Sequence, residues 1–157
     1  MSNAFSSYTF NLLPIFENDL TKSGWILTSE IDDADGEFAI DVLDILQEGE
    51  VISLHGLIDI AKDNDALCSQ RHIESILRKQ EDLSVQERLK LLPAECQECC
   101  SIAAGTILVD SKNRPFMSYI AWCPSEWLES KSKWEMRFYC AKIGFNHHFK
   151  LLKARKL

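Results

Sequence analysis

Acidic and basic side chains are separated along this chain of 157 residues. Residues 1–100 carry 20 acidic and 7 basic residues, a net charge of −13, whereas residues 101–157 carry 4 acidic and 10 basic residues, a net charge of +6. The stretch from Ser23 to Ala61 contains ten acidic residues and neither Lys nor Arg. Mutual repulsion at this density destabilises a compact state. The fold must therefore either spread these carboxylates over a solvated surface or bring the basic third of the chain against them.

Length and composition are typical of one globular domain, residues 1–157. With 46% apolar residues, a chain of this size buries roughly 70% of the surface that its unfolded form exposes. No run of about 18 apolar residues is present, so we expect no membrane span and no membrane partner. The first ten residues, MSNAFSSYTF, lack the basic and apolar regions of a secretory signal. We therefore expect a cytoplasmic protein whose six cysteines are free thiols.

Both ends of the chain have strand composition. Near the N-terminus, residues 8–15 and 25–31 are rich in aromatic and aliphatic side chains and predict a pair of strands. Near the C-terminus, the apolar runs 105–110 and 116–123 flank a polar loop and predict a hairpin. Residues 133–145 have strand composition and predict a further strand. The basic tail that follows, HHFKLLKARKL, is expected to be helical or frayed.

The middle of the chain, about residues 36–104, has helical periodicity. Apolar residues recur every three or four positions in residues 37–49, 51–65 and 69–80, which predicts three helices. A fourth helix begins with the capping box Ser84–Glu87. The expected fold is therefore α+β. Its helical middle packs on an antiparallel sheet formed by the C-terminal hairpin strands and by the N-terminal strand pair.

The acidic turn IDDADGEF has to be tested against the calcium loop of an EF-hand. Such a loop needs acidic residues at positions 1, 3 and 5, Gly at position 6 and Glu at position 12. With Gly36 at position 6, position 1 is Ile31 and position 12 is Val42. Both ends of the ligand set are missing. The turn is therefore interpreted as the start of a helix, whose dipole favours acidic residues there.

Three of the six cysteines, Cys96, Cys99 and Cys100, lie within the sequence ECQECC. The spacing Cys-x-x-Cys occurs in zinc sites, but no second Cys pair and no His-x₃₋₅-His accompanies it. The same spacing supports thiol redox chemistry when it opens a helix after a strand, and here it follows a predicted helix and Pro93. On a helix the three thiols share one face and suit a packed core. Buried thiols are therefore the favoured interpretation, with a zinc site and a redox site as the alternatives.

Catalytic and nucleotide-binding signatures are missing from the sequence, which contains no G-x-S-x-G, P-loop or G-x-G-x-x-G. We therefore expect neither an enzyme nor a cofactor. The C-terminal third interleaves basic and aromatic residues, a pattern that suits single-stranded nucleic acid. However, the protein as a whole is acidic, with a pI of about 5.1, and its first half repels a polyanion. Nucleic acid is therefore not the expected partner.

In its size, its acidic charge and its lack of catalytic motifs, the chain resembles bacterial toxin-immunity proteins as a class. The resemblance covers no alignable segment and transfers no functional residue. It implies a protein that binds a cationic, nuclease-type toxin domain and neutralises it, because surface charge of one sign selects partners of the opposite sign. A thiol or zinc-site protein and a non-catalytic structural subunit are the alternatives.

The residues expected to bind this basic partner are the carboxylates of the acidic stretch and one aromatic anchor. They are Trp25, Asp32, Asp33, Asp35, Glu37, Asp41, Asp44, Glu48 and Glu50. No metal ion belongs to this expected site. If the alternative zinc site exists, Cys96, Cys99 and Cys100 are its ligands.

Overall fold

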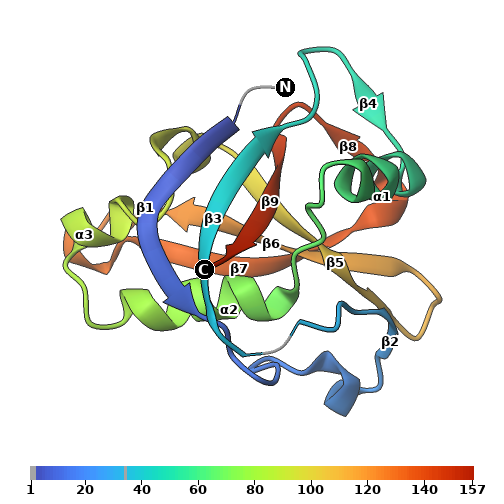
Figure 1. Ribbon diagram of the computed structural model, residues 1–157, viewed down its shortest axis with the longest axis horizontal. Coiled ribbons are helices and arrows are strands. Elements are labelled where there is room, and N and C mark those ends of the chain that lie inside the picture. Colours follow the sequence, from blue (N-terminus) through green and yellow to red (C-terminus); the bar gives the residue numbers. More distant parts are fainter. Residues whose placement is uncertain (1–2, 34) are drawn as a thin grey trace.

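The computed structural model describes residues 3–33 and 35–157. Its centre is a curled seven-stranded sheet in the order β1-β3-β9-β5-β6-β7, with β2 beside part of β5 (Figure 1). A second, two-stranded sheet joins β4 to β8. The strands are β1 (Asn3–Asn11), β2 (Ile26–Ser29), β3 (Glu37–Asp44), β4 (Val51–Ile52), β5 (Cys100–Val109), β6 (Pro115–Cys123), β7 (Lys133–Cys140), β8 (Phe145–Asn146) and β9 (Phe149–Lys156). The α-helices are α1 (Leu54–Asp63), α2 (Gln70–Gln80) and α3 (Val85–Leu89).

The large sheet is mixed and divides at β5. β3 is antiparallel to β1 and to β9, and β6 is antiparallel to β5 and to β7. β9 runs parallel to β5 along residues 100–102. β2 pairs with residues 107–109, farther along the edge of β5 that β9 uses. β9 and β2 therefore share one edge of β5. Among the described residues, β2 pairs with no other strand of the sheet.

Gly105 lies on β5 between the residues that pair with β9 and those that pair with β2. Its N–H donates to the main-chain oxygen of Cys68 over 2.7 Å. A Cβ at this position would lie 2.8 Å from that oxygen and 2.8 Å from Cγ2 of Ile31. Only glycine allows so close an approach of two backbones. The segment after β2 and the start of α2 are thereby brought against the middle of β5.

Both faces of the sheet are buried. α2 covers one face (Figure 1), and the large side chains of the core on that side are Phe10, Ile40, Ile73, Ile76, Ile120 and Trp134. The core on the opposite face includes α1, and its large side chains are Leu43, Leu57, Ile102, Met117, Phe145 and Leu151. Burying about a dozen side chains of this size stabilises the fold by roughly 1.5–3 kcal/mol each before conformational entropy is counted.

The predicted helices around residues 51–65 and 69–80 are confirmed as α1 and α2. Ser69 begins α2: its Oγ accepts the N–H of Arg71 over 3.0 Å, and its own N–H donates to Nδ1 of His72 over 2.9 Å. The capping box at Ser84 is also confirmed, because Ser84 Oγ accepts the N–H of Glu87 at the start of α3. In the described part of the chain, no helix has the length and apolar content needed to cross a membrane.

Residues 37–49 form a strand and a turn, so the prediction of a helix there was wrong. β3 lies between β1 and β9. Its residues Phe38, Ile40 and Val42 enter the core on the α2 side, whereas Leu43 enters the opposite core. A strand that is buried on both faces lacks a clean alternation of polar and apolar residues. Its apolar residues therefore also fit a helical spacing.

The basic tail forms β9, so the prediction of a helical or frayed end was also wrong. Leu151 and Leu152 are adjacent in sequence, and both are fully buried because they enter opposite cores. β9 pairs with β3 on one side and with β5 on the other. The composition of this segment does not predict a strand. It forms one because neighbouring strands pair with both of its edges.

The N-terminal strands exist, but they do not pair with each other as predicted. β1 pairs with β3, and β2 pairs with β5. The predicted C-terminal hairpin is confirmed as β5 and β6. In its turn, the carboxylate of Asp110 accepts the N–H groups of Lys112 and Arg114. The strand predicted for residues 133–145 is confirmed as far as Cys140, where a short 3-10 turn begins.

Candidate functional site

The basic tail pairs with part of the acidic stretch. On β9, Arg155 Nε contacts the Asp41 carboxylate over 2.8 Å. Lys150 forms an ion pair with Asp44, its cross-strand neighbour in the register of β3 and β9. Lys156 Nζ lies 3.1 Å from Oδ1 of Asp33. Three of the eight carboxylates predicted to bind a partner are therefore paired within the fold, and Asp41 is 5% exposed.

The other five predicted carboxylates are exposed, and they lie in two places. Asp32, Asp35 and Glu37 precede or begin β3, whereas Glu48 and Glu50 follow its end. An eight-residue strand spans roughly 25 Å. Figure 1 shows the start of β3 near α2 and its end near β4. The predicted set is therefore divided by the length of β3 and does not form one continuous surface.

A groove of about 410 Å³ lies beside the first of these two groups. We call it the acidic groove. Its lining residues come from the segment after β1, from β2, from the segment that leads to β3 and from the start of α2: Pro14, Ile15, Phe16, Asp19, Thr21, Leu27, Glu30, Ile31, Asp32, Asp33 and Arg71. Two predicted residues, Asp32 and Asp33, lie in this groove. Asp19 and Glu30 are carboxylates that the prediction did not include.

The only cation that lines the acidic groove, among the described residues, is Arg71. It is 8% exposed, and its guanidinium donates to the main-chain oxygens of Leu13 (3.2 Å) and Asp33 (3.1 Å). Its Nε also lies 3.6 Å from the Glu30 carboxylate. This one positive charge is therefore directed into the protein. Of the four carboxylates that line the groove, Asp33 is paired with Lys156, so Asp19, Glu30 and Asp32 give the groove its negative charge.

Two of these carboxylates are fixed by hydroxyl groups. Glu30 accepts hydrogen bonds from Ser69 Oγ over 2.9 Å and from Thr106 Oγ1 over 2.8 Å. Asp19 accepts from the hydroxyl and the N–H of Thr21, and these bonds lower the pKa of its carboxyl group. Such hydrogen bonds orient a charge before any partner arrives, which reduces the entropy lost on binding.

Apolar side chains lie on and beside the acidic groove. Ile15 and Leu27 line it and are 74% and 38% exposed. Ile26, the neighbour of Leu27 on β2, is 64% exposed. Charged groups next to exposed aliphatic groups are a combination that protein interfaces use, because the apolar contacts exclude water from the polar ones. The groove thus has the chemistry of a protein-binding surface.

A smaller hollow of about 110 Å³ adjoins the acidic groove and shares Asp33 with it. Asp35, Glu37, His72 and Lys156 also line this hollow. Burial lowers the pKa of His72 to about 4, although the nearby Asp33 carboxylate opposes the shift. The imidazole is therefore neutral at pH 7 and adds no positive charge to this part of the surface.

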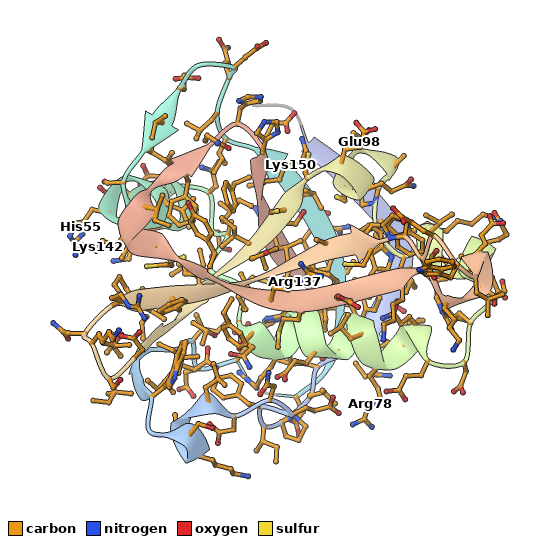
Figure 2. The ribbon with its side chains drawn as sticks, turned by 180° about the vertical axis from the view of Figure 1, so that it is seen from behind. His55, Arg78, Glu98, Arg137, Lys142 and Lys150 are labelled. Carbon is orange, nitrogen blue, oxygen red and sulfur yellow. The ribbon has the colours of Figure 1, made fainter. Side chains whose placement is uncertain are left out.

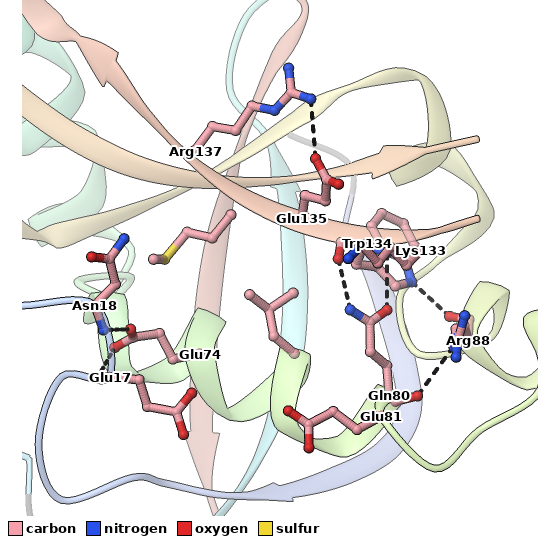
Figure 3. Close-up of a pocket in the computed structure, with 12 residues that line it drawn as sticks. Glu17, Asn18, Glu74, Gln80, Glu81, Arg88, Lys133, Trp134, Glu135 and Arg137 are labelled. Atoms are coloured by element: carbon pink, nitrogen blue, oxygen red, sulfur yellow. Dashed lines mark hydrogen bonds and ion pairs between the residues drawn. The ribbon is translucent and has the colours of Figure 1, made fainter. Parts of the chain in front are cut away.

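A separate hollow of about 710 Å³ lies between α2 and β7 (Figure 3). Its polar groups are mostly bonded to one another. The Glu74 carboxylate accepts the N–H groups of Glu17 and Asn18. The side-chain amide of Gln80 both donates to and accepts from the main chain of Trp134. This hollow is larger than the acidic groove but less strongly charged, since cations and anions both line it.

No family model, curated protein or solved structure matches this chain. Its function has to be inferred from the chemistry of its own surface. On that surface, the acidic groove brings two carboxylates of the predicted set next to exposed apolar side chains.

Trp25, the predicted aromatic anchor, is not freely exposed. Its ring packs against Phe116 and Phe138, with centroid distances of 4.7 and 6.2 Å. Trp127 is 96% exposed, in the loop between β6 and β7. The sequence signal for Trp127 was its position in the polar segment PSEWLESK, and the prediction missed it.

The three clustered cysteines do not share one helical face as predicted. Cys96 is buried in a 3-10 turn, Cys99 is extended, and Cys100 begins β5. Burial raises the pKa of the Cys96 thiol to about 12, and it also raises the pKa values of Cys99 and Cys100. Within residues 3–33 and 35–157, no group of three or more Cys, His, Asp or Glu side chains is placed to hold a metal ion. Because their pKa values are raised, these thiols are poor nucleophiles at neutral pH.

Proposed function

We propose that this protein is an acidic protein-binding module that acts as an immunity protein. It binds a cationic, nuclease-type toxin directly and neutralises it. The observation that carries this proposal is the acidic groove, in which four carboxylates lie beside exposed aliphatic side chains and the guanidinium of Arg71 is engaged by main-chain oxygens.

Charge supports this assignment through association kinetics and selectivity. A negative surface attracts a positively charged partner over about a Debye length, roughly 10 Å at 0.1 M salt. Nucleases carry positive surface charge because their substrate is a polyanion. A toxin that approaches the groove would place basic side chains against Asp19 and Asp32, while Ile15 and Leu27 supply the apolar contact that slows dissociation.

The proposed contact surface is smaller than the one expected from the sequence. Asp33, Asp41 and Asp44 each have a basic partner on β9. Glu48 and Glu50 lie beyond the far end of β3. The surface therefore comprises the acidic groove, with Asp35 and Glu37 at the adjoining hollow.

Affinity capture from an extract of the native host tests the proposal. The immobilised protein is incubated with extract at about 50 mM salt, a concentration at which surface charges are weakly screened. We expect it to retain a basic protein, to release it when the salt is raised, and to inhibit its nuclease activity at one molar equivalent. The substitutions Asp19→Asn and Asp32→Asn together should weaken this binding roughly tenfold, because two charged contacts are lost.

Glu48→Gln and Glu50→Gln form the matched control, because they remove the same charge at the other end of β3. This control variant should retain the partner with unchanged affinity. Recovery of no basic protein would contradict the proposal. Binding that depends equally on both pairs of substitutions would contradict the assignment to the acidic groove.

A further inference from the structure

β7 forms one edge of the large sheet. It pairs with β6 through all eight of its residues without a register shift, and among the described residues no strand lies on its other side. Native proteins usually shorten, bend or cover such an edge, because its unpaired N–H and C=O groups accept another strand. β7 is neither short nor interrupted by a bulge. Its outer edge is therefore a template for pairing.

Gln80 shows which backbone groups face outward. Its side-chain oxygen accepts the N–H of Trp134 over 3.0 Å, and its side-chain nitrogen donates to the main-chain oxygen of Trp134 over 2.7 Å (Figure 3). The backbone of Trp134 therefore points away from β6. In an antiparallel ladder alternate residues share this direction. The N–H and C=O groups of Met136 and Phe138 consequently point outward as well.

The hollow of about 710 Å³ lies along this edge. Residues 133–137 of β7 line one side of it. Glu74 and Leu77 of α2, together with Glu81, the residue that follows the helix, line another side, which we call the α2 wall. An extended residue in a packed sheet occupies roughly 160 Å³, from a rise of about 3.3 Å, a strand spacing of about 4.8 Å and a sheet spacing of about 10 Å. The hollow therefore has the volume of roughly four extended residues.

We propose that this edge is a docking site for an extended segment of a partner protein. The segment adds to the sheet as a strand beside β7 and forms hydrogen bonds with the outward-facing groups of Met136 and Phe138. One of its side chains, an aliphatic one, packs over Leu77 and Met136. A neighbouring lysine or arginine side chain lies beside Glu81.

Charge complementarity selects the basic side chain. On the α2 wall, Glu81 is exposed and has no ion-pair partner among the described residues, whereas Glu17 is paired with Arg78. Arg88 is engaged by the main-chain oxygens of Gln80, Ser130 and Ser132.

Lys133, Glu135 and Arg137 of β7 also line the hollow. Side chains alternate along a strand, so Lys133, Glu135 and Arg137 lie on the face opposite to Trp134 and Met136. Arg137, which is labelled in Figure 2, is paired there with Glu135 (Figure 3). On the α2 wall, the charge that has no ion-pair partner among the described residues is therefore the carboxylate of Glu81.

A second copy of the chain fits this edge less well than a single strand. Two β7 strands paired about Met136 would place the partner's Phe138 opposite Trp134. Gln80 already occupies both backbone groups of Trp134. A symmetric pairing of two β7 strands would therefore lose the hydrogen bonds at both of its ends, where Trp134 faces Phe138 of the other copy.

The probe is a phage-displayed library of random nine-residue peptides, selected on the immobilised whole chain. Enriched sequences are synthesised with both termini capped, and their dissociation constants are measured by calorimetry. We expect enriched peptides to carry an aliphatic residue and a lysine or arginine two positions apart or next to each other. Protection of the Met136 and Phe138 amides from hydrogen exchange should rise when these peptides bind.

Met136→Pro is the decisive variant. Proline removes an N–H that points outward, so the ladder with β6 keeps its hydrogen bonds. Met136→Ala is its control, because it loses the side chain but keeps the N–H. We expect peptide binding to be about tenfold weaker in the proline variant than in the alanine variant, a difference of about 1.4 kcal/mol. Circular dichroism verifies that both variants are folded.

Glu81→Lys gives a second, independent measurement, with Asp82→Lys as the matched control outside the hollow. The first substitution should weaken binding of a basic peptide at least threefold more than the second. Three outcomes would overturn the proposal: no enrichment over an unrelated protein, equal binding to the proline and alanine variants, or Met136 and Phe138 amides already protected by a dimer in the free protein. The hollow and the acidic groove share no lining residue, so this test is independent of the proposed immunity function.

Discussion

Arg155 on β9 contacts Asp41 on β3 through its Nε, at 2.8 Å from the carboxylate. The two residues are 114 positions apart. The Asp41 side chain is 6% exposed, whereas that of Arg155 is 44% exposed. This pair joins the basic end of the chain to the middle of its acidic stretch. Together with the pairs Lys150–Asp44 and Lys156–Asp33, it offsets part of the repulsion within a segment of 39 residues that contains no Lys or Arg.

Replacing Arg155 with methionine should lower the free energy of unfolding by about 1–2 kcal/mol. The substitution keeps the length of the aliphatic stem but leaves a largely buried carboxylate without its partner. Urea denaturation at pH 7 measures the effect. Arg137→Met is the matched control, since its pair with Glu135 is exposed, and we expect it to change stability by less than about 0.5 kcal/mol. Equal effects of the two substitutions would contradict the structural importance of the pair with Asp41.

Stability should fall between pH 6.5 and pH 4 because of His72. Burial lowers the pKa of this imidazole to about 4, below its ordinary value of 6.5. In this interval the unfolded chain binds a proton that the folded chain does not, so acidification favours unfolding. A shift of this size corresponds to roughly 3 kcal/mol, lost progressively as the pH falls to 4 and unchanged above about pH 7.

A His72→Gln variant isolates this contribution. Asp33, Arg71 and Lys156 also influence the imidazole, and they remain in the variant. Urea denaturation of both proteins at pH 7, 6, 5 and 4 should show that the wild-type protein loses stability faster on acidification. Parallel curves for the two proteins would show that His72 does not titrate as described.

Thiol reactivity should separate the six cysteines into two groups. Cys68 and Cys96 are fully buried, and burial raises the pKa of both thiols. We expect a thiol-reactive dye to modify at most four cysteines in the native protein and all six after denaturation, because the thiolate is the reactive form. Reaction of more than four thiols without denaturant would contradict this assignment.

Metal content is an independent measurement on the same cysteines. Cys96, Cys99 and Cys100 lie on different local structures, and Cys96 points into the core. We expect less than about 0.2 zinc per chain in protein purified without a chelator, since a structural zinc site binds one ion through four ligands. A stoichiometric zinc content would instead favour the alternative zinc-site function.

Trp25, which is packed, and Trp127, which is exposed in a loop, should respond differently to truncation. Trp25→Ala should lower the free energy of unfolding by about 2 kcal/mol, because the ring packs on Phe116 and Phe138. Trp127→Ala should change it by less than about 0.5 kcal/mol, since the side chain is 96% exposed. Thermal denaturation measures both effects. A stability loss at Trp127 as large as that at Trp25 would contradict the described packing.

Local sequence signals predicted the structure where an element satisfies its own hydrogen bonds or has a regular pattern. The capping box at Ser84, the helix that begins after Ser69 and the hairpin around Asp110 all have such signals, and all three were predicted. The predicted helix in residues 37–49 failed for the opposite reason. β3 is a strand because β1 and β9 pair with it on both sides, and a strand buried on both faces has no periodicity of its own.

The candidate site was predicted in part. Asp32 and Asp33 line the acidic groove, but Asp19 and Glu30 were missed because they lie outside the densest part of the acidic stretch. The groove forms only when the segment after β1 meets the segment after β2. These residues come together through Gly105 and α2, and no pattern in the sequence shows that approach.

By itself, the sequence determined the α+β class, the helices α1 and α2, the C-terminal hairpin and the separation of charge between the two parts of the chain. These properties depend on composition and on neighbouring residues. Only the tertiary structure decided which carboxylates remain available, because β9 places Lys150, Arg155 and Lys156 beside Asp44, Asp41 and Asp33. Charge along a chain is fixed by its residues, whereas charge on a surface depends on which strands pair.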